Sequence, residues 1–265
     1  MTSDGFIDAH CHLADPSFDS DFEAVIQRSQ AAGVTGWIQG GVGPEDWKKQ
    51  KVLQKRLKPH CYLAFGVHPW WASQESESSV VAALKVLEQE LPEAHFLGEC
   101  GLDQAPRFAN KIQWQLEVFR LQLLLNQTFK KPLILHVVQA HAEALNALKG
   151  HSGSGGIVHA FSEGKEVLKK YLDLGFLISV GGAVTRPGYR KLKEVLQMIP
   201  LDRLVVETDA PDQTPLLENL NRESRNEPCY LVGIANVLAQ TRGGLSGTEL
   251  LWKSTENLRQ LLASS

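Results

Sequence analysis

Two histidines separated by one residue, His10 and His12, close an apolar run near the start of the chain. In an extended strand alternate side chains point to the same side, so both imidazoles face one way while Cys11 faces the other. Two imidazoles held together can bind a divalent cation. The pair alone is a weak signal, because a single histidine is more often a surface or core residue than a ligand.

Four more ligand-type residues lie at or just after the ends of other apolar runs: Glu99, His136, His159 and Asp209. An unpaired carboxylate beside a buried run is costly. A salt bridge could satisfy Glu99 or Asp209, but a metal site explains both carboxylates together with the histidines. Mixed nitrogen and oxygen ligation suits Zn²⁺, Mn²⁺, Fe²⁺ or Ni²⁺ better than Ca²⁺ and does not choose among them.

Eight short apolar runs alternate with segments that carry apolar residues at helical spacing. Most runs are nearly continuous in apolar residues, as expected for strands covered on both faces. The helical segments are 21–32, 80–90, 113–125, 143–149, 165–174 and 189–197. The expected strands are 6–10, 34–39, 61–67, 94–98, 133–137, 156–160, 176–180 and 203–207.

Eight strands alternating with helices predict an α/β fold, a single (β/α)8 TIM barrel spanning residues 1–265. Residues 227–262 are expected to form two further helices that close the barrel. An open, doubly wound sheet is the rival architecture. In a barrel of this kind chemistry gathers at the C-terminal ends of the strands, where all six candidate ligands are placed.

Composition limits the classes of partner. Of 265 residues 43% are hydrophobic, enough for a sizeable core, and the net charge of −3 gives no global attraction to polyanions. Four cysteines without a CxxC pair fit reduced thiols. The N-terminus does not resemble a secretion signal, and no apolar run reaches membrane-spanning length. We therefore expect a cytoplasmic protein with no membrane association and no obligate protein partner.

Several ordered motifs resemble the TatD family of metal-dependent deoxyribonucleases, within the amidohydrolase-like TIM-barrel hydrolases. The similarity spans nearly the whole chain, so it is more specific than any one motif. The matching segments are Ile7-Asp8-Ala9-His10-Cys11-His12, Gly66-Val67-His68-Pro69, Gly98-Glu99-Cys100-Gly101-Leu102-Asp103, His159-Ala160-Phe161-Ser162, Glu207-Thr208-Asp209-Ala210-Pro211 and Arg225-Asn226-Glu227-Pro228.

The resemblance implies two divalent ions, drawn from Zn, Mn, Mg, Fe or Ni, with Glu99 as the bridge. One ion would be held by His10, His12, Glu99 and Asp209, and the other by Glu99, His136 and His159. It also implies hydrolysis of phosphodiester bonds in DNA, commonly from an end, with His68 beside the substrate. Asp209 would orient the attacking water and act as general base.

Other residues receive supporting roles. Trp70 could stack on a base, or pack into the barrel rim instead. Arg186, after the seventh strand, could contact a phosphate or begin a solvated helix. Asp103 and Glu207 are expected to orient metal ligands, although either could be an ordinary buried acceptor.

Two positions differ from the family pattern. Val138 stands where the family usually has arginine, and Glu163 stands where it usually has glycine. Losing a cation and gaining an anion are both unfavourable for a phosphate site. Three functions therefore stay open: a DNA phosphodiesterase, a metal-dependent hydrolase of amides, lactones or small phosphate esters, and a non-enzymatic metal-binding scaffold.

Overall fold

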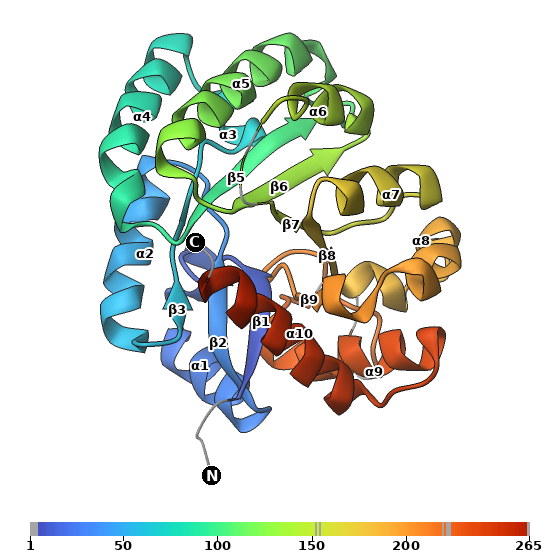
Figure 1. Ribbon diagram of the computed structural model, residues 1–265. Helices are drawn as coiled ribbons and strands as arrows, with labels where there is room; N and C mark the ends of the chain where they lie inside the picture. The colour runs from blue at the N-terminus through green and yellow to red at the C-terminus, as the bar shows by residue number, and fades with distance from the viewer. Residues whose placement is uncertain (1–4, 152, 154, 219, 221–223, 264–265) are drawn as a thin grey trace.

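The protein is built on parallel strands that follow one another in chain order (Figure 1). The structure, a computed structural model, describes residues 5–151, 153, 155–218, 220 and 224–263. One sheet has the order β1-β2-β3 and the other β4-β5-β6-β7-β8-β9. The strands are β1 (Phe6–Cys11), β2 (Val34–Gln39), β3 (Cys61–Tyr62), β4 (Ala64–Phe65), β5 (Phe96–Asp103), β6 (Leu133–Val138), β7 (Gly156–Val158), β8 (Phe176–Val180) and β9 (Leu204–Val206).

The two sheets form one ring. Only Leu63 separates β3 from β4, and its carbonyl oxygen accepts the amide N–H of Phe96 at 3.1 Å. At the opposite seam the amide N–H of Asp209, just after β9, donates to the carbonyl oxygen of His10 in β1 at 2.9 Å. Eight parallel segments thus surround one interior. The predicted (β/α)8 barrel is confirmed, and the open doubly wound sheet is excluded.

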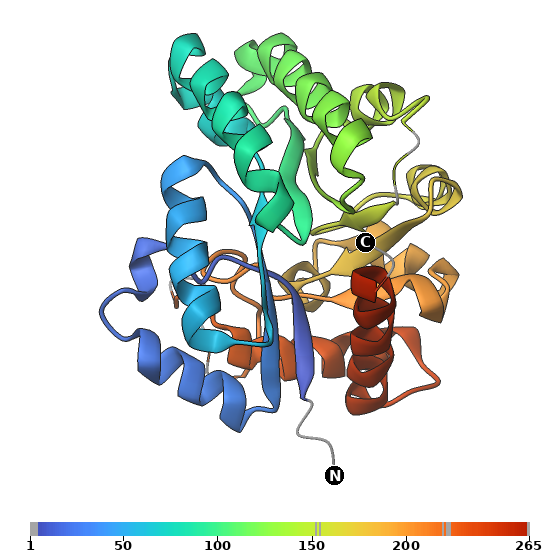
Figure 2. The ribbon, with the colours of Figure 1, turned by 60° about the vertical axis from the view of Figure 1, so that its left-hand side comes forward.

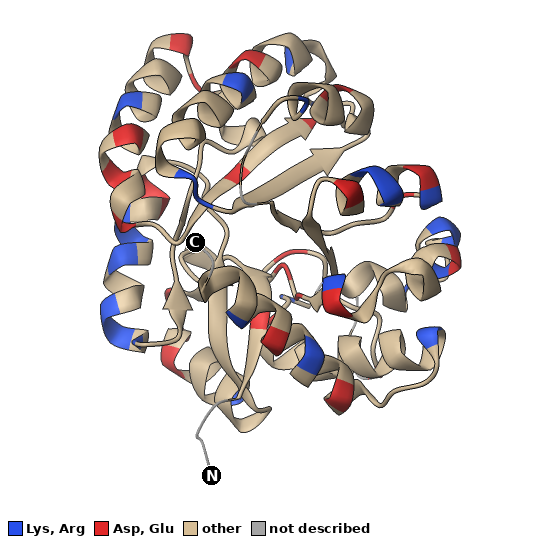
Figure 3. Cartoon of the chain, in the orientation of Figure 1, with Lys and Arg blue, Asp and Glu red and all other residues tan. Residues whose placement is uncertain are grey.

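Helices surround the ring, as two views of the ribbon show (Figures 1 and 2). Their apolar faces meet the outward side chains of the strands in a large buried layer. Their outer faces carry most of the charged residues (Figure 3). The helices are α1 (Phe22–Ala31), α2 (Pro44–Leu57), α3 (Pro69–Gln74), α4 (Glu77–Glu90), α5 (Ile112–Phe129), α6 (His141–Ala147), α7 (Lys165–Asp173), α8 (Arg190–Val195), α9 (Leu231–Arg242) and α10 (Gly247–Ala263).

A second, smaller apolar cluster fills the barrel interior. It contains inward side chains of the strands, among them Ile7, Ile38 and Phe96, together with Leu258 from α10. Helix α10 packs against β1 and β9, and Thr255 Oγ1 accepts the amide N–H of Ile7 at 3.1 Å. Helix α10 therefore covers the N-terminal end of the barrel, as predicted for a helix of the 227–262 segment.

Regular alternation of side chains along a strand turns some candidate ligands inward, and irregular strand pairing turns others inward. In β6, Ile134 points inward between Leu133 and Leu135, which point outward. In β5, by contrast, Gly98 and Cys100 pair with the adjacent residues Ile134 and Leu135, so the strand holds one extra residue. Such a bulge changes which face the following side chains occupy. A similar irregularity lies in β1 between Asp8 and Cys11.

Two expectations about the environment can be compared with the structure. The four cysteines are free thiols, which agrees with the expected absence of a disulfide framework. Cys11 and Cys100 are buried in the outer layer, turned away from the barrel interior. None of the helices in the described ranges is long and apolar enough to cross a membrane.

Candidate metal centre

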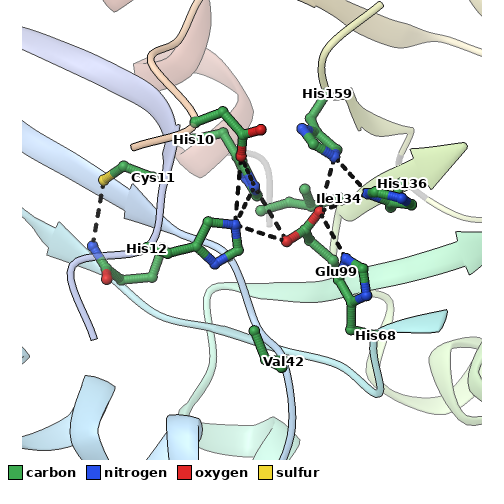
Figure 4. Close-up of polar contacts among 12 residues, drawn as sticks. His10, Cys11, His12, Val42, His68, Glu99, Ile134, His136 and His159 are labelled. Atoms are coloured by element: carbon green, nitrogen blue, oxygen red, sulfur yellow. Dashed lines mark hydrogen bonds and ion pairs between the residues drawn. The ribbon is translucent and has the colours of Figure 1, made fainter. Parts of the chain in front are cut away.

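The six candidate ligands converge at the C-terminal end of the barrel. Figure 4 shows His10, His12, Glu99, His136 and His159 gathered there. The six come from five different strand ends, and each is buried or nearly so. β1 supplies His10 and, one residue beyond its end, His12; β5 supplies Glu99, β6 supplies His136, and His159 and Asp209 follow β7 and β9.

Glu99 lies at the centre of this cluster. Its Oε1 is 3.3 Å from His10 Nε2 and 3.1 Å from His12 Nε2. Its Oε2 is 2.9 Å from His159 Nε2 and 3.4 Å from His136 Nδ1. Although both oxygens are buried, neither makes a hydrogen bond of acceptable geometry to a described residue. One carboxylate therefore faces two sets of imidazole nitrogens without being satisfied by either.

The spacing of these nitrogens fits divalent cations. His10 Nε2 lies 3.2 Å from His12 Nε2, and His136 Nδ1 lies 3.0 Å from His159 Nε2. Nitrogens bound tetrahedrally at zinc-like distances are about 3.3 Å apart. Two imidazole lone pairs that face each other this closely repel unless a proton or a cation lies between them. The donor set fits metal ions.

Asp209 completes the side of the cluster next to β1. Its Oδ1 lies 3.5 Å from the Nε2 atoms of both His10 and His12. Its Oδ2 accepts a hydrogen bond of 2.6 Å from Gln213 Nε2. The backbone of Asp209 has a φ of 59°, a left-handed conformation that is strained for a residue other than glycine. Local contacts must therefore hold this residue in place.

Two buried polar residues supply such contacts. Asn226 Nδ2 donates to the carbonyl oxygens of Thr208 and Asp212, each at 2.6 Å, and so spans the turn that carries Asp209. Asp8 accepts the amide N–H of Thr208 at 2.9 Å and its hydroxyl at 2.5 Å. Burial raises the pKa of Asp8 to about 8 despite these hydrogen bonds. The Asp209 turn is fixed from both sides.

The electrostatics of the cluster favour positive charge at its centre. Burial alone would raise the pKa of Glu99, but the charges of His10 and the neighbouring histidines hold it well below its usual value. Burial alone would lower the pKa values of His12 and His159, but the charge of Glu99 raises both well above the ordinary value. Protons or metal ions can supply this positive charge.

Asp103 and Glu207, the two expected orienting residues, lie next to different histidines. Asp103 Oδ2 is 3.1 Å from His136 Nε2, so His136 donates from Nε2 and turns its Nδ1 lone pair toward Glu99. Glu207 Oε1 is 3.7 Å from His159 Nδ1, longer than a hydrogen bond. It accepts the amide N–H of Ala160 at 2.6 Å instead. Glu207 thus holds the backbone directly after His159.

His68 is close to the cluster but differs from the ligand candidates. Three groups of ligand atoms lie within metal-holding distance of one another: His10, His12 and Glu99; His10, His159 and Asp209; and His68, Glu99 and His136. His68 Nδ1 accepts the amide N–H of Trp70 at 3.0 Å. Burial lowers the pKa of His68 to about 4, so the ring is neutral and its proton is on Nε2. The Nε2 atom of His68 lies 3.6 Å from Glu99 Oε2, which is longer than a hydrogen bond.

Trp70 and Arg186, the other two proposed substrate contacts, have different surroundings. Trp70 lines the cavity of about 180 Å³ that contains the ligand candidates. Its indole N–H donates to Asp103, and the guanidinium of Arg107 lies 4.8 Å from the centroid of its ring. Arg186 donates to the carbonyl oxygen of Thr214 at 3.0 Å and lines neither this cavity nor the one beside it. The structure does not bring Arg186 to the centre.

A family model described as TatD related DNase matches residues 7–263. This chain belongs to the TatD family. The metal-dependent hydrolase YjjV of Escherichia coli, curated as uncharacterized, is 35% identical over 241 residues, which cover 89% of this chain and 90% of that protein. The 3'-5' ssDNA/RNA exonuclease TatD of Pantoea vagans is 33% identical over 259 residues, covering 96% and 98%.

A solved structure of a TatD family member supports the same assignment. The crystal structure of the TatD homologue YjjV from E. coli superposes with a TM-score of 0.87 at 30% sequence identity, over 98% of each chain. The family resemblance expected from the motifs is therefore confirmed. The strand pairing and this superposition both support the TatD barrel.

Four residues next to the centre were given no role from sequence: Asp8, Gln213, Asn226 and His141. A carboxylate inside the apolar run 6–9 was a usable signal for Asp8. Asn226 lies in the motif Arg225-Asn226-Glu227-Pro228, whose sequence alone does not indicate a role for the amide. Gln213 and His141 carry no local signal, because only the tertiary fold brings them to the same end of the barrel.

Proposed function

We propose that this TatD family member is a two-metal phosphodiesterase that removes nucleotides from an end of single-stranded DNA. The observation that carries the proposal is the buried Glu99 carboxylate, with each oxygen facing a separate set of imidazole nitrogens. The names of the curated relatives, several of them 3'-5' ssDNA/RNA exonucleases, support the substrate class.

The ligands divide into two sets that share Glu99. One ion would be held by His10, His12, Glu99 and Asp209, and the other by Glu99, His136 and His159. When bound, two divalent ions would activate water and stabilise charge on the phosphoryl oxygens. We leave the choice among Zn, Mn, Mg, Fe and Ni to metal analysis.

The side chains around the centre then have separate tasks. Asp209 Oδ1 would accept the proton of the attacking water, while Gln213 holds the other carboxylate oxygen. Burial would raise the pKa of Asp209, but hydrogen bonding from His12 and the charges of nearby histidines lower it to about 2, so the carboxylate is ionised and able to accept. His68 would donate a hydrogen bond from its Nε2–H to a phosphoryl oxygen. Asp103 would keep His136 in the tautomer that leaves Nδ1 free.

Metal removal and a substrate panel test the proposal. The purified protein is stripped with a chelator, reloaded with each metal, and incubated with end-labelled single-stranded DNA, bis(4-nitrophenyl) phosphate and a set of lactones. We expect two metal ions per chain by elemental analysis, and DNA hydrolysis that is lost on chelation and restored by metal.

The other outcomes select the alternatives. Turnover of lactones without turnover of DNA would identify a hydrolase of another class on the same barrel. Metal binding without any turnover would indicate a scaffold. Full DNA hydrolysis after metal removal would contradict the two-metal proposal outright.

A further inference from the structure

A second cavity opens beside the metal centre. It has a volume of about 360 Å³ and shares His136 and His159 with the centre. Its other walls come from the C-terminal ends of β6 to β9, the same end of the barrel that carries the ligand candidates. They are formed by Val137, Val138, Gln139, His141, Ala160, Ser162, Glu163, Ala183, Tyr189 and Gln213.

The polar groups of this wall are nearly all neutral. Apart from the two shared histidines, hydrogen bonds can come from one histidine, two glutamines, a serine and a tyrosine, and the one formally charged side chain is Glu163. No lysine or arginine is among the described residues that line it. Lys191 reaches Glu163 Oε2 at 3.7 Å, but it is mostly exposed and lies outside the wall. A second phosphate group of a substrate, bound in this cavity, would therefore lie near the Glu163 carboxylate and near no lysine or arginine of the described lining.

His141 is the most firmly oriented donor of this wall. Its Nδ1 lies 3.0 Å from the hydroxyl oxygen of Tyr171, whose side chain is fully buried. A buried hydroxyl hydrogen needs an acceptor, and Nδ1 is the contact recorded for it. Donation from Tyr171 places the imidazole proton on Nε2, the nitrogen on the far side of the ring. Because His141 lines the cavity, this N–H is available to a ligand there.

We infer that this cavity is a subsite for one uncharged nucleoside next to the scissile phosphate, with His141 as its specificity-determining hydrogen-bond donor. The inference rests on the proposed phosphodiesterase function and narrows its substrate class. The volume lies within the range of small-molecule pockets. Glu163 selects against a nucleotide that carries a further phosphate at that end. The preferred substrate is therefore a strand whose terminal nucleoside bears no phosphate.

The first test compares two phosphodiesters. The dinucleotide dTpdT offers a nucleoside to the cavity, whereas bis(4-nitrophenyl) phosphate does not. For the metal-loaded His141→Ala variant we expect the ratio of kcat/KM for dTpdT to that for bis(4-nitrophenyl) phosphate to fall about 10-fold, the effect of one lost hydrogen bond. His141→Gln keeps an N–H donor and should recover part of the ratio. His60→Ala, outside both cavities, should leave it unchanged.

The Tyr171→Phe variant keeps the imidazole of His141 but removes the hydroxyl group that fixes the position of its proton. Without the phenol, the proton can move to Nδ1, so the ratio should fall in the same direction as in His141→Ala, but less. A ratio unchanged in both His141→Ala and Tyr171→Phe would overturn the inference while leaving phosphodiesterase activity intact.

The second test adds phosphate. The substrates are dTpdT and its 5'- and 3'-phosphorylated forms, one of which carries the additional phosphate on the nucleoside that enters the cavity. The wild-type protein should hydrolyse dTpdT about 10-fold better than that form. Glu163→Gln should reduce this preference, and Glu163→Asp should keep it. Equal use of all three dinucleotides by the wild-type protein would overturn the inference.

A binding measurement keeps the two proposals distinguishable. Binding of free thymidine, followed by saturation-transfer NMR, requires no turnover. Thymidine binding that is weakened by His141→Ala supports the subsite even if no phosphodiester is hydrolysed, a result that would count against the proposed function alone. Equal thymidine binding by the wild type and His141→Ala would count against the subsite alone.

Discussion

The two ends of the barrel follow opposite rules. At the N-terminal end the interior is apolar, with Leu258 of α10 packed among inward strand residues such as Ile7 and Phe96. At the C-terminal end the interior is polar, and Glu99 is buried without a hydrogen bond to any residue of the described ranges. The first end gains stability from burial, and the second holds together groups that repel or stay unsatisfied until a ligand arrives.

The backbone geometry also differs between the two ends of the barrel. Near α10 the buried amide groups of Ile7 and Val206 donate to the hydroxyl groups of Thr255 and Ser254, although β1 has one register shift there, between Phe6 and Ile7. Near the metal centre, β1 and β5 each have an irregular register, and Ala160 and Asp209 have left-handed backbone conformations. Of the five non-glycine residues with a left-handed backbone in the described ranges, four follow β6, β7 or β9 at the end that carries the candidate ligands, and only Lys130, after α5, lies at the other end. Three substitutions test this contrast between the two ends.

Glu99→Gln should have the largest effect. The amide keeps the shape of the side chain but removes the charge that both metal sets share. We expect activity on DNA to fall roughly 10²–10³-fold, the range found when one preorganised electrostatic group is removed from a site. Metal content by elemental analysis should fall with it.

The thermal midpoint of metal-free Glu99→Gln should also fall, because the charge of Glu99 offsets the charges of the surrounding histidines, which hold its pKa well below the usual value. Glu249→Gln, at the start of α10, is the matched control and should keep both metal and activity. Unaltered metal content in Glu99→Gln would show that this carboxylate is not the shared ligand.

Leu258→Ala tests the other end. Its side chain is fully buried in the barrel interior, so truncation should lower the free energy of unfolding by about 2–5 kcal/mol. Urea denaturation measures the loss. The kcat of the folded fraction should stay close to that of the wild type. Leu121→Ala, at a position that is 44% exposed, should cost far less. A large fall in kcat with unchanged stability would refute the division between the two ends.

The smallest effect concerns the rim outside the metal centre. Arg225 donates to both carboxylate oxygens of Asp21, at 2.7 and 2.8 Å, and this hydrogen bonding lowers the pKa of Asp21 from 3.8 to about 2. A carboxyl whose pKa is lower in the folded protein stabilises it above pH 4, and that contribution is lost as the pH falls toward 2. Because Asp21 is solvent-exposed, the effect is small.

Calorimetry between pH 7 and pH 2.5 can detect this contribution. The Tm of Asp21→Asn should lie slightly below that of the wild type at pH 7 and converge with it at low pH. Asp173→Asn, an exposed aspartate at the end of α7, should run parallel to the wild type throughout. A constant difference for Asp21→Asn across the whole range would contradict the assigned pKa.

Sequence reasoning succeeded where a local pattern determines the structure. The spacing of His10 and His12 predicted that both imidazoles face one way with Cys11 opposite, and the structure agrees. The positions of His136 and His159 near the ends of their strands were also predicted from the apolar runs. The expected strand at 94–98, however, is too short, because β5 continues to Asp103.

It reached less far where distant segments meet. For Arg186 the sequence offers a phosphate contact or the start of a solvated helix. Its guanidinium donates to the carbonyl oxygen of Thr214, 28 residues further along the chain, and its role in substrate binding stays a prediction. His141 carries no local signal, because nothing in its neighbourhood along the chain reveals Tyr171 or the cavity. The assignment of residues 1–265 to one domain, and of the protein to the cytoplasm, stays a prediction.

The extra residue in β5 makes the length of that strand as important as its composition. Outward Leu97 and inward Phe96 set one phase, and after the irregular step Cys100 and Leu102 continue outward in the opposite phase. Removing a single residue here would leave a well-paired strand in which regular alternation keeps Asp103 inward but provides no inward position for Glu99 between Gly98 and Cys100. Such a strand can accept many exchanges of residue type, but it cannot lose one position without losing the central carboxylate from the barrel mouth.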